Sequence, residues 1–299
     1  MSLRSLPFIR KLKQEDVTVL TAIERLMKTY NYVPIEDLPD STDFSSSRIE
    51  IILTKLHRFR FIKRWSQAYE AVYLTFDGLD SLALYSLRNL NAVGPPIGIG
   101  KESRVFNGAY SSEDEEINVA VKLHRLERAF KATRRKRDYS KDRHHLRPIE
   151  ESKIAAKKEY DALMRLYQRI RVPKPYAHNR HIVVMEKVIG DELSKVRQLE
   201  KETAKEIFES IIVAVRESFQ CGLIHADLSE FNIIINEEHE PVLIDWPQWV
   251  DADHVDKERL LLRDISNICV YFSKKYDIYV PDPKGLTKLI LQDLQPGTP

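Results

Sequence analysis

Cysteine is scarce in this chain, and apolar runs of membrane-spanning length are missing from it. The 299 residues contain two cysteines, Cys221 and Cys269, whose spacing matches neither a disulfide framework nor a zinc site. The first residues lack the apolar stretch of a signal peptide, and no segment approaches the length of a transmembrane helix. The net charge of +2 excludes a chain that is a polycation throughout. We therefore expect a cytoplasmic protein without structural disulfides or structural zinc.

The most informative segment is the run HADLSEFN at 225–232, which is followed by Asp245. Phosphoryl transfer needs a carboxylate that positions the acceptor and oxygen ligands that hold magnesium against the phosphates. Asp227 suits the first role, and Asn232 and Asp245 suit the second. Two short apolar runs flank a polar turn at 237–240, which predicts a hairpin that returns Asp245 to the side of Asp227. A capping aspartate and a strand-ending aspartate are each common alone, but the spaced set predicts a catalytic site.

Upstream residues have the features of a nucleotide-binding half. Gly98 and Gly100 precede a strand of alternating apolar residues, and glycines allow a backbone to approach phosphates closely. Such loops are often only turns, and here Ser103 stands where a third glycine is usual, with a hydroxyl that is placed to contact phosphate. The next predicted strand contains Lys122 in the run VAVKL, which matches the strand lysine that pairs with nucleotide phosphates in kinases. A lysine that reaches solvent from a strand edge is the alternative.

A helix predicted over residues 155–166 supplies Glu159, the best candidate to orient Lys122. A buried strand predicted at 183–188 then leaves the smaller lobe, where backbone groups are placed to bond adenine. The order along the chain is glycine loop, lysine, acidic helix, hinge, catalytic loop and metal aspartate, which is the order found in kinases. The residues that we assign to nucleotide binding are Gly98, Gly100, Lys101, Glu102, Ser103, Val105, Lys122, Glu159, Met185, Glu186 and Val188.

Neither Asp-Phe-Gly nor Ala-Pro-Glu follows the metal aspartate, and too few residues remain to build the activation loop and peptide-binding subdomains of ordinary kinases. Four segments, 100–103, 225–232, 244–248 and 263–268, instead resemble signatures of the RIO family of atypical serine/threonine protein kinases. The resemblance extends over roughly residues 1–280. It implies a compact, archaeal-like kinase or ATPase that uses ATP with Mg²⁺ or Mn²⁺.

The resemblance also assigns roles to single residues. It implies that Ser103 and Lys122 contact phosphates and that Asp227 is the catalytic aspartate. It implies that Asn232 and Asp245 bind the metal. Some family members are thought to capture phosphate on the metal-binding aspartate, so the resemblance makes Asp245 a candidate phospho-acceptor as well.

The chain departs from the family pattern at two places. Trp246 follows the metal aspartate, where the family usually has Phe, and we expect this large apolar residue to pack similarly. Arg128-Ala129 stands where archaeal relatives often carry a Thr-Ser pair that is autophosphorylated. Any self-modification therefore uses another residue, with Thr133 and Ser140 the nearest hydroxyls.

The first 90 residues are independent of the catalytic region by their pattern. Three predicted helices are followed by two short strands around a polar turn, which predicts a winged helix-turn-helix and is similar to the winged-helix branch of the RIO family. The predicted fold class is α+β, with a trimmed, two-lobed kinase-like domain after this winged helix. The expected parts are the winged helix at 1–90, a linker at 91–96, the N-lobe at 97–185 with a basic flexible loop at 125–147, the C-lobe at 186–285 and a C-terminal tail at 286–299.

Positive charge gathers on the third predicted helix and the wing, where Glu50 alone opposes it locally. Such a patch can neutralise nucleic-acid phosphates, and Trp65 or Tyr69 could stack on bases; a solvated helix face with a packing aromatic is the alternative. The basic segment 125–147 is either a flexible surface loop or a flap beside the nucleotide that orders against ribosomal RNA. The candidate nucleic-acid contacts are Arg48, Lys55, Arg58, Arg60, Lys63 and Arg64.

Three functions fit these features. The resemblance favours a kinase or ATPase that acts in small-ribosomal-subunit maturation, with the pre-ribosomal particle and its RNA as partners and no membrane. An aminoglycoside-type phosphotransferase has a similar catalytic loop, but Pro247-Gln248, the basic insertion and the winged helix argue against it. The third is a nucleotide-sensing assembly factor that binds ribosomal RNA and has little kinase turnover.

Overall fold

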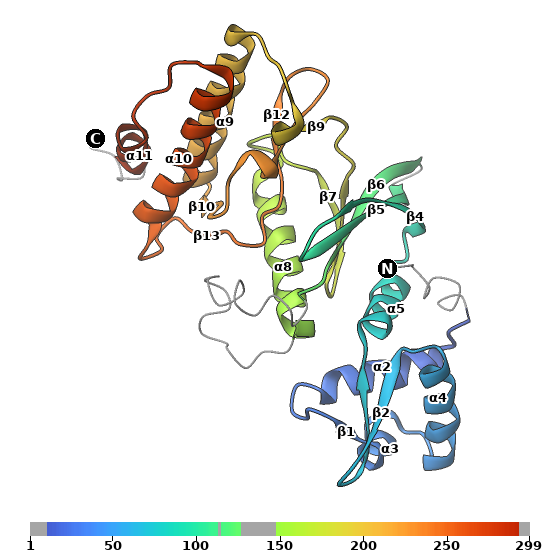
Figure 1. The fold of residues 1–299 in the computed structure, drawn as a ribbon. Helices are drawn as coiled ribbons and strands as arrows, with labels where there is room; N and C mark the ends of the chain where they lie inside the picture. The colour runs from blue at the N-terminus through green and yellow to red at the C-terminus, as the bar shows by residue number, and fades with distance from the viewer. Residues whose placement is uncertain (1–10, 113–114, 127–147, 293–299) are drawn as a thin grey trace. The chain divides into compact units, whose positions relative to one another are not determined.

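The computed structural model describes residues 11–112, 115–126 and 148–292. The chain divides into two compact units, with the boundary in the sequence between Asn91 and Ala92, and each unit is described here by itself (Figure 1). Among the described residues, no helix combines the length and the apolar character that a membrane span requires.

The first unit packs helices around a small antiparallel sheet. Its helices are α2 (Gln14–Leu26), α3 (Leu38–Thr42), α4 (Ser46–Arg58) and α5 (Phe76–Ser86). Its strands are β1 (Val33–Pro34), β2 (Ile62–Ser66) and β3 (Glu70–Leu74), in the order β1-β3-β2. Three helices followed by the β2–β3 hairpin form the predicted winged helix-turn-helix, and β1 and α5 add elements that we did not predict.

Local sequence explains why α4 forms and how it is buried. The hydroxyl of Ser45 accepts the backbone N–H of Arg48 at 3.3 Å, which satisfies one of the free N–H groups at the start of the helix. The apolar residues recur at helical intervals on one face, and Ile49, Leu53 and Leu56 are fully buried there. The opposite face of α4 therefore carries its charged residues.

The second unit begins with a five-stranded antiparallel sheet, in the order β4-β5-β6-β8-β7. Its strands are β4 (Leu90–Ile99), β5 (Ser103–Ser112), β6 (Glu115–His124), β7 (Pro175–Asn179) and β8 (Ile182–Glu186). The helix α8 (Pro148–Leu166) packs against β6, β7 and β8. This is the N-lobe of a kinase-like domain, with its lysine strand β6 in the centre of the sheet.

The segment 91–96 is part of a strand, although we expected an irregular linker there. It lies in β4, at the edge of the sheet beside β5. Pro95 and Pro96 cannot donate backbone hydrogen bonds, and prolines are tolerated in an edge strand because one side has no partner strand. The glycine and prolines that suggested a linker therefore mark an edge strand.

Helices and two small sheets form the rest of the second unit. The helices are α9 (Lys201–Gln220), α10 (Lys257–Tyr276) and α11 (Pro283–Gln292), with α9 and α10 packed side by side (Figure 1). One sheet has the order β12 (Pro241–Leu243), β11 (Ile233–Ile235), β9 (Asp191–Glu192). The other pairs β10 (Leu223–Ile224) with β13 (Val250–Asp251). The β11–β12 hairpin agrees with the predicted one.

Two expected segments need comment. Residues 286–292, assigned above to a C-terminal tail, belong to α11, whose Ile290 is 3% exposed and packs into the core. The tail assignment was wrong there, because the apolar spacing of this helix is buried against α10. The basic segment 125–147 lies outside the described residues, except for Arg125 and Leu126.

Candidate active site

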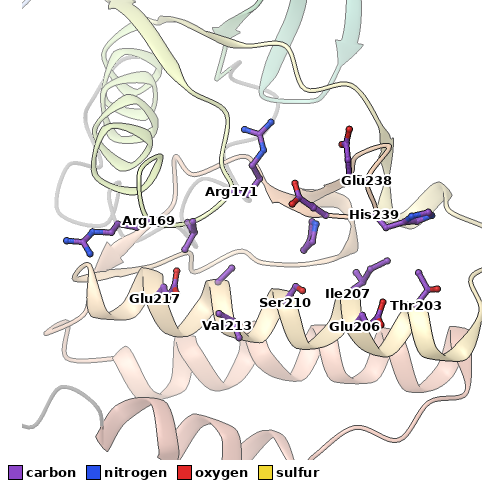
Figure 2. Close-up of a pocket in the computed structure, with 14 residues that line it drawn as sticks. Arg169, Arg171, Thr203, Glu206, Ile207, Ser210, Val213, Glu217, Glu238 and His239 are labelled. Carbon is purple, nitrogen blue, oxygen red and sulfur yellow. The ribbon is translucent and has the colours of Figure 1, made fainter.

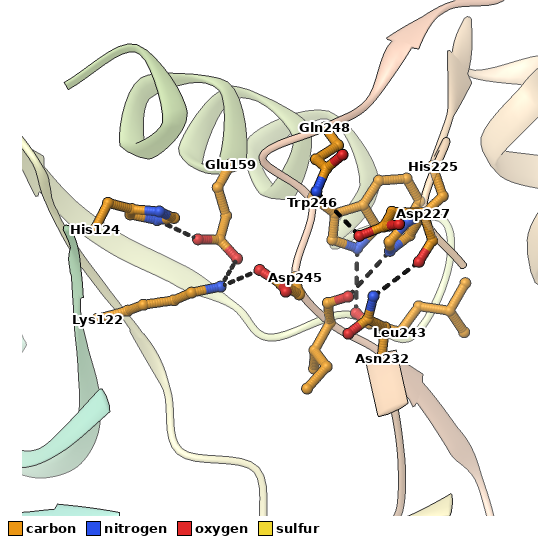
Figure 3. Close-up of polar contacts among 11 residues, drawn as sticks. Lys122, His124, Glu159, His225, Asp227, Asn232, Leu243, Asp245, Trp246 and Gln248 are labelled. Atoms are coloured by element: carbon orange, nitrogen blue, oxygen red, sulfur yellow. Dashed lines mark hydrogen bonds and ion pairs between the residues drawn. The ribbon is translucent and has the colours of Figure 1, made fainter. Parts of the chain in front are cut away.

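Lys122 is buried in the middle of the five-stranded sheet. Its backbone on β6 lies opposite Val105 on β5 and Val183 on β8. Its Nζ lies 2.6 Å from Oε1 of Glu159 and 2.7 Å from Oδ1 of Asp245 (Figure 3). Burial disfavours the ammonium, but the carboxylates of Asp245 and Glu159 outweigh it and hold the pKa of Lys122 above its ordinary value. Lys122 is therefore a fixed internal cation, and the strand-edge alternative does not apply.

Glu159 is held from two sides. It comes from α8 and is 1% exposed. One oxygen contacts Lys122, and the other, Oε2, lies 2.6 Å from Nε2 of His124. Burial alone would raise the pKa of Glu159, but Lys122 and His124 more than offset it and lower the pKa to about 2. The structure thus brings the expected carboxylate to the lysine and keeps it ionised.

Asp227 and Asn232 lie on one loop and are tied together. Asn232 ends the 3₁₀ turn η4 (Glu230–Asn232), and its Nδ2 donates to the carbonyl oxygen of Asp227 at 2.8 Å. The side chain of Asp227 is exposed, and its Oδ2 accepts a hydrogen bond from Nε2 of Gln248 at 3.0 Å (Figure 3). Because the amide nitrogen of Asn232 is occupied, its oxygen is the atom that remains for a ligand.

The β11–β12 hairpin brings Asp245 beside this loop. Ile233 lies opposite Leu243, and the backbone N–H of Ile244 donates to the carbonyl of Asn232 at 3.0 Å. Asp245 follows with φ of +66°, in the left-handed region, where the chain leaves the strand direction. The three expected site residues therefore converge, as the spacing of the motif predicts.

Trp246 anchors the segment after Asp245 in the core. Its side chain is fully buried, and its Nε1–H donates to the carbonyl of Leu243 at 3.2 Å. Its ring lies 4.4 Å from the ring of His225, whose Nε2 is 3.0 Å from the carbonyl of Ile244. Burial lowers the pKa of His225, so the imidazole is neutral and Nε2 carries the proton that this carbonyl accepts. Both rings fix the position of Asp245, the next residue in the chain after Ile244.

Asp264 on α10 holds the loop that carries Asp227 through hydrogen bonds to its backbone. It is 1% exposed, and its carboxylate accepts the backbone N–H of Ala226 at 2.7 Å and that of Leu228 at 3.2 Å. Burial raises the pKa of Asp264 to about 7, against the opposing influence of Arg263 and the two N–H groups. Asn267, on the same helix, donates to the carbonyl of Leu228 at 3.0 Å. These bonds fix the backbone on both sides of Asp227.

The donor set fits a magnesium ion that is held jointly with phosphates. Among the described residues, no group of three or more His, Cys, Asp and Glu side chains is arranged to hold a metal. Magnesium in phosphoryl-transfer enzymes is usually bound by one or two carboxylates together with substrate phosphates, and all of its ligands are oxygens. Asp245 and Asn232 supply oxygens at the end of the hairpin, and Lys122 adds a positive charge for phosphate. A protein-only cage of carboxylates is not needed for this chemistry.

The glycine turn lies between β4 and β5. Gly98 is near the end of β4, and the backbone N–H of Gly100 donates to the carbonyl of Ser103 at 2.9 Å, which closes the turn. Lys101 and Glu102 occupy the turn. Because β5 pairs directly with the lysine strand β6, the turn lies at the same end of the sheet as the start of the basic segment.

The hinge residues have unequal freedom to bond a ligand. Met185 is 7% exposed, and the backbone N–H of Glu186 donates to the carbonyl of Lys174 at 2.8 Å. The carboxylate of Glu186 forms a two-pronged pair with Arg171, at 2.6 and 2.9 Å. Adenine recognition by Glu186 therefore has to use its carbonyl. Val188 lies two residues beyond, after the end of β8.

The basic patch of the winged helix is partly neutralised within its own unit. Three of its six members form ion pairs: Arg48 with Glu15, Lys55 with Asp16, and Arg64 with Glu50. The expectation that Glu50 alone opposes the patch is therefore wrong, because α2 packs against α4 and brings two acidic residues to it. Within the described part of the chain, Arg58, Arg60 and Lys63 form no ion pair.

The two aromatic residues of the wing differ in exposure. Trp65 stacks on Tyr32 with ring centroids 4.7 Å apart, so one of its faces is already covered. Tyr69 is 43% exposed, although its hydroxyl donates to the carbonyl of Tyr32 at 3.2 Å. The packing alternative therefore applies to Trp65, and Tyr69 is the more accessible ring.

Sequence reasoning missed His124, Gln248 and Asp264 as site residues. His124 stands two positions after Lys122, and residues two apart on a strand share a face, so this signal was readable. Gln248 and Asp264 lie within segments that resembled family signatures, but nothing local shows what they contact. Asp264 reaches residues 36 and 38 positions away in the chain.

Comparison with known families agrees with this geometry. The family model described as the RIO domain matches residues 104–284, and the model described as Rio2, N-terminal, matches residues 9–90. The RIO-type serine/threonine-protein kinase Rio2 of Methanocaldococcus jannaschii is 35% identical over 262 residues, which cover 86% of this chain and 96% of that protein.

Eukaryotic relatives and a solved structure extend the comparison. The serine/threonine-protein kinase rio2 of Dictyostelium discoideum is 33% identical over 90% of this chain, which spans 52% of that protein's length. The crystal structure of the Rio2 kinase-ADP/Mg²⁺-phosphoaspartate complex from Chaetomium thermophilum superposes with a TM-score of 0.79 and 29% identity. That match covers 96% of this chain and 89% of the other. It confirms the predicted fold, a winged helix followed by a two-lobed, kinase-like α+β domain.

A RIO domain model thus covers more than half of the chain, a Rio2-type domain precedes it, and Rio2 kinases from archaea and eukaryotes align along nearly all of it. The chain belongs to the RIO family of serine/threonine-protein kinases, in the branch that carries the Rio2 winged-helix domain.

Proposed function

We propose that this chain is an ATP- and Mg²⁺-dependent serine/threonine protein kinase with ATPase activity. The observation that carries the proposal is the convergence of Lys122, Glu159 and Asp245 in one ion-paired cluster. The β11–β12 hairpin connects this cluster to the loop that carries Asp227 and Asn232. These are a phosphate-binding cation, its orienting carboxylate, a metal carboxylate and a loop carboxylate. Their order and contacts are those that phosphoryl transfer requires.

In the proposed mechanism, each residue has one task. Lys122 binds nucleotide phosphate, and Glu159 and His124 keep its ammonium in place. When bound, magnesium supplies positive charge that offsets the phosphate oxygens during transfer. Asp227 is exposed and accepts the proton of the attacking hydroxyl, because its backbone is fixed and its carboxylate faces solvent.

Asp245 is proposed to hold the metal together with Asn232. It is also proposed as a phospho-acceptor, since the related Chaetomium thermophilum kinase was solved as an ADP/Mg²⁺-phosphoaspartate complex. A lasting phosphoaspartate would favour the assembly-factor role, in which one cleavage event and slow release matter more than repeated turnover. This is the second candidate function that an observation supports.

The proposed partners rest on the charged and aromatic surface of the winged helix. We propose the pre-ribosomal small subunit and its RNA, with the uncompensated Arg58, Arg60 and Lys63 and the exposed Tyr69 as the contact surface. Binding of a ribosomal RNA fragment should weaken, and its salt dependence flatten, when the three basic residues are replaced by Gln. Unchanged binding would remove the patch from the proposal. Two free cysteines are compatible with a cytoplasmic location.

Single-turnover ATP cleavage tests the catalytic assignment. Asp227→Ala should lower the rate by roughly 10²–10⁴-fold and leave nucleotide affinity nearly unchanged, because its carboxylate acts in the chemical step. Asp245→Ala should also weaken magnesium-dependent nucleotide binding. Asp253→Ala, at an exposed position outside the site, is the matched control and should behave like the wild type.

Mass spectrometry of the same reactions distinguishes the two functions. Phosphate on Asp245 supports the phospho-acceptor role, and phosphate on a protein substrate's serine or threonine supports conventional kinase turnover. Wild-type ATP cleavage by both aspartate variants would show that the assigned roles are wrong.

A further inference from the structure

A groove of about 460 Å³ lies on the second unit, and none of the proposed catalytic residues lines it. One wall is a face of α9, and the other is formed by residues 169–171 and by the turn between β11 and β12 (Figure 2). In Figure 2, Glu206, Ser210 and Glu217 follow one another along α9, with Arg171 and Glu238 across from them. The groove is thus a separate feature from the cluster around Lys122.

The groove is long enough for an extended peptide. Its lining on α9 runs from Thr203 to Glu217 and uses residues that recur every three or four positions, so it follows one face of the helix over about four turns. Fourteen steps of helix correspond to about 21 Å, and an extended chain advances about 3.3 Å per residue. About six residues of a peptide would fill this length.

The floor of the groove is apolar. Ile207 is 2% exposed, and Ile170 and Ala214 are also buried, whereas Val213 is 53% exposed on the same wall. Val213 is therefore an apolar side chain that has no cover within the described part of the chain. A peptide that lies in the groove would bury it against an apolar side chain of its own.

The rim carries more negative than positive charge. Four Glu and two Arg line the groove, and the charge of Arg171 is already paired with Glu186 outside it. Among the described residues, Glu206, Glu217 and Glu238 form no ion pair. The pKa of Arg171 is raised first by its hydrogen bond to Glu186 and then by the charges of Glu240 and Glu238, so Arg171 offsets part of the charge of the rim. The groove therefore presents negative charge along an apolar floor.

One lining residue of the groove, Arg171, also contacts Glu186 and the β11–β12 hairpin. Arg171 forms its two-pronged pair with Glu186, and its carbonyl accepts the backbone N–H of Leu243, two residues before Asp245, at 3.1 Å. An occupant that displaces the Arg171 guanidinium would act on a residue that the active site depends on. Binding of a partner in the groove could therefore affect the residues around Glu186.

We propose that this groove binds an extended, basic segment of a partner protein, with lysines or arginines along the Glu206–Glu238 rim and an apolar side chain over Val213. The charge of the rim selects a cationic peptide, and the length and apolar floor favour a chain of several residues over a small cation. This inference stands independently of the catalytic assignment, because it uses different residues.

Fluorescence anisotropy with the full-length chain tests the proposal. The probe is a labelled eight-residue peptide that alternates arginine and leucine, and the matched peptide replaces arginine with glutamate. The basic peptide should bind and the acidic one should not. Glu206→Gln combined with Glu238→Gln removes two exposed charge pairs with the peptide, so it should weaken binding by about two- to thirtyfold. Glu209→Gln, an exposed position on α9 outside the groove, should change affinity less than about twofold.

Three results would overturn the proposal. The first is equal binding of both peptides, and the second is a double variant that melts and cleaves ATP like the wild type but keeps full peptide affinity. The third is a concentration-dependent dimer in sedimentation that the double variant abolishes, since the groove would then be covered by a second copy. Val213→Ser should also weaken binding of the basic peptide. Unchanged affinity of this variant would show that no apolar side chain of the peptide packs on Val213.

Discussion

Replacing Asp264 by asparagine changes one buried oxygen into an amide nitrogen and leaves the side-chain shape nearly unchanged. In the wild type, the two carboxylate oxygens accept the backbone N–H groups of Ala226 and Leu228, which flank Asp227. An asparagine can accept one of these bonds with its oxygen, but its NH₂ group then faces the other N–H. The substitution therefore removes one hydrogen bond and opposes two donors in a buried place.

The size of the effect follows from burial. With a folded pKa of about 7, the Asp264 carboxyl is mostly neutral at pH 6. The hydrogen bond that is lost is therefore one to a neutral acceptor, which contributes about 0.5–1.5 kcal/mol, and a buried donor left without a partner costs about 1–3 kcal/mol. We expect Asp264→Asn to lower the free energy of unfolding by about 3 kcal/mol at pH 6. Because the Asp227 backbone is then free to shift, we also expect kcat for ATP cleavage to fall by about tenfold or more.

The pH dependence has a definite sign. Burial raises the pKa of Asp264 to about 7 in the folded chain, whereas an unfolded aspartate has a pKa of about 3.9. The folded state therefore holds a proton that the unfolded state has lost, and the stability contributed by Asp264 falls as the pH rises through 7. The deficit of the asparagine variant should shrink by about 1 kcal/mol between pH 6 and pH 8.

Urea unfolding and single-turnover ATP cleavage, both measured at pH 6 and pH 8, check these expectations. Asp256→Asn is the matched control, because Asp256 precedes the same helix, is 39% exposed and pairs with Arg259 at the surface. Its effect should stay within about 0.5 kcal/mol. If Asp264→Asn unfolds within the same margin and cleaves ATP at the wild-type rate, the carboxylate does not hold the loop.

Two further predictions concern the lysine cluster. Glu159 has a pKa of about 2 in the folded chain and about 4.3 when unfolded, so the stability that it contributes is present above pH 4.3 and is lost as the pH falls. Between pH 6 and pH 3, the free energy of unfolding measured in urea should fall by about 2 kcal/mol more for the wild type than for Glu159→Gln. Parallel pH curves for the two proteins would refute this. His124→Leu should raise KM for ATP several-fold with a smaller change in kcat. His124→Gln keeps an N–H near the Nε2 position and should restore most of the affinity for ATP. Equal KM values in steady-state assays would show that His124 does not orient Glu159.

Features encoded by short-range patterns were predictable from the sequence. The hairpin that returns Asp245 to Asn232 follows from two apolar runs around a polar turn, and the structure pairs Ile233 with Leu243 there. The winged helix follows from helical and strand periodicities of the same local kind. The catalytic loop was readable because its residues lie within about twenty positions of one another.

Features that depend on packing between distant segments were not predictable. Asp264 leaves no local sign that it will hold Ala226, because that contact forms only after α10 packs under the loop. The neutralisation of Lys55 by Asp16 across 39 positions escaped for the same reason. Residues 91–96 looked like a linker because glycine and proline punctuate loops, and only the edge position of β4 makes a strand compatible with them.

The burial of Trp246 has a consequence for inhibitors. In protein kinases, the packing of the aromatic residue after the metal aspartate distinguishes active from inactive arrangements. A compound that fills the space behind this residue needs the ring to swing outward. Here the indole is fully buried, packs at a tilt against the ring of His225 and donates to the carbonyl of Leu243. Exposing about 200 Å² of that ring would cost about 5 kcal/mol, which corresponds to more than a thousandfold in affinity. Compounds that need the swung-out arrangement should therefore spare this enzyme, and selective chemistry should aim at the closed arrangement of the aspartate segment.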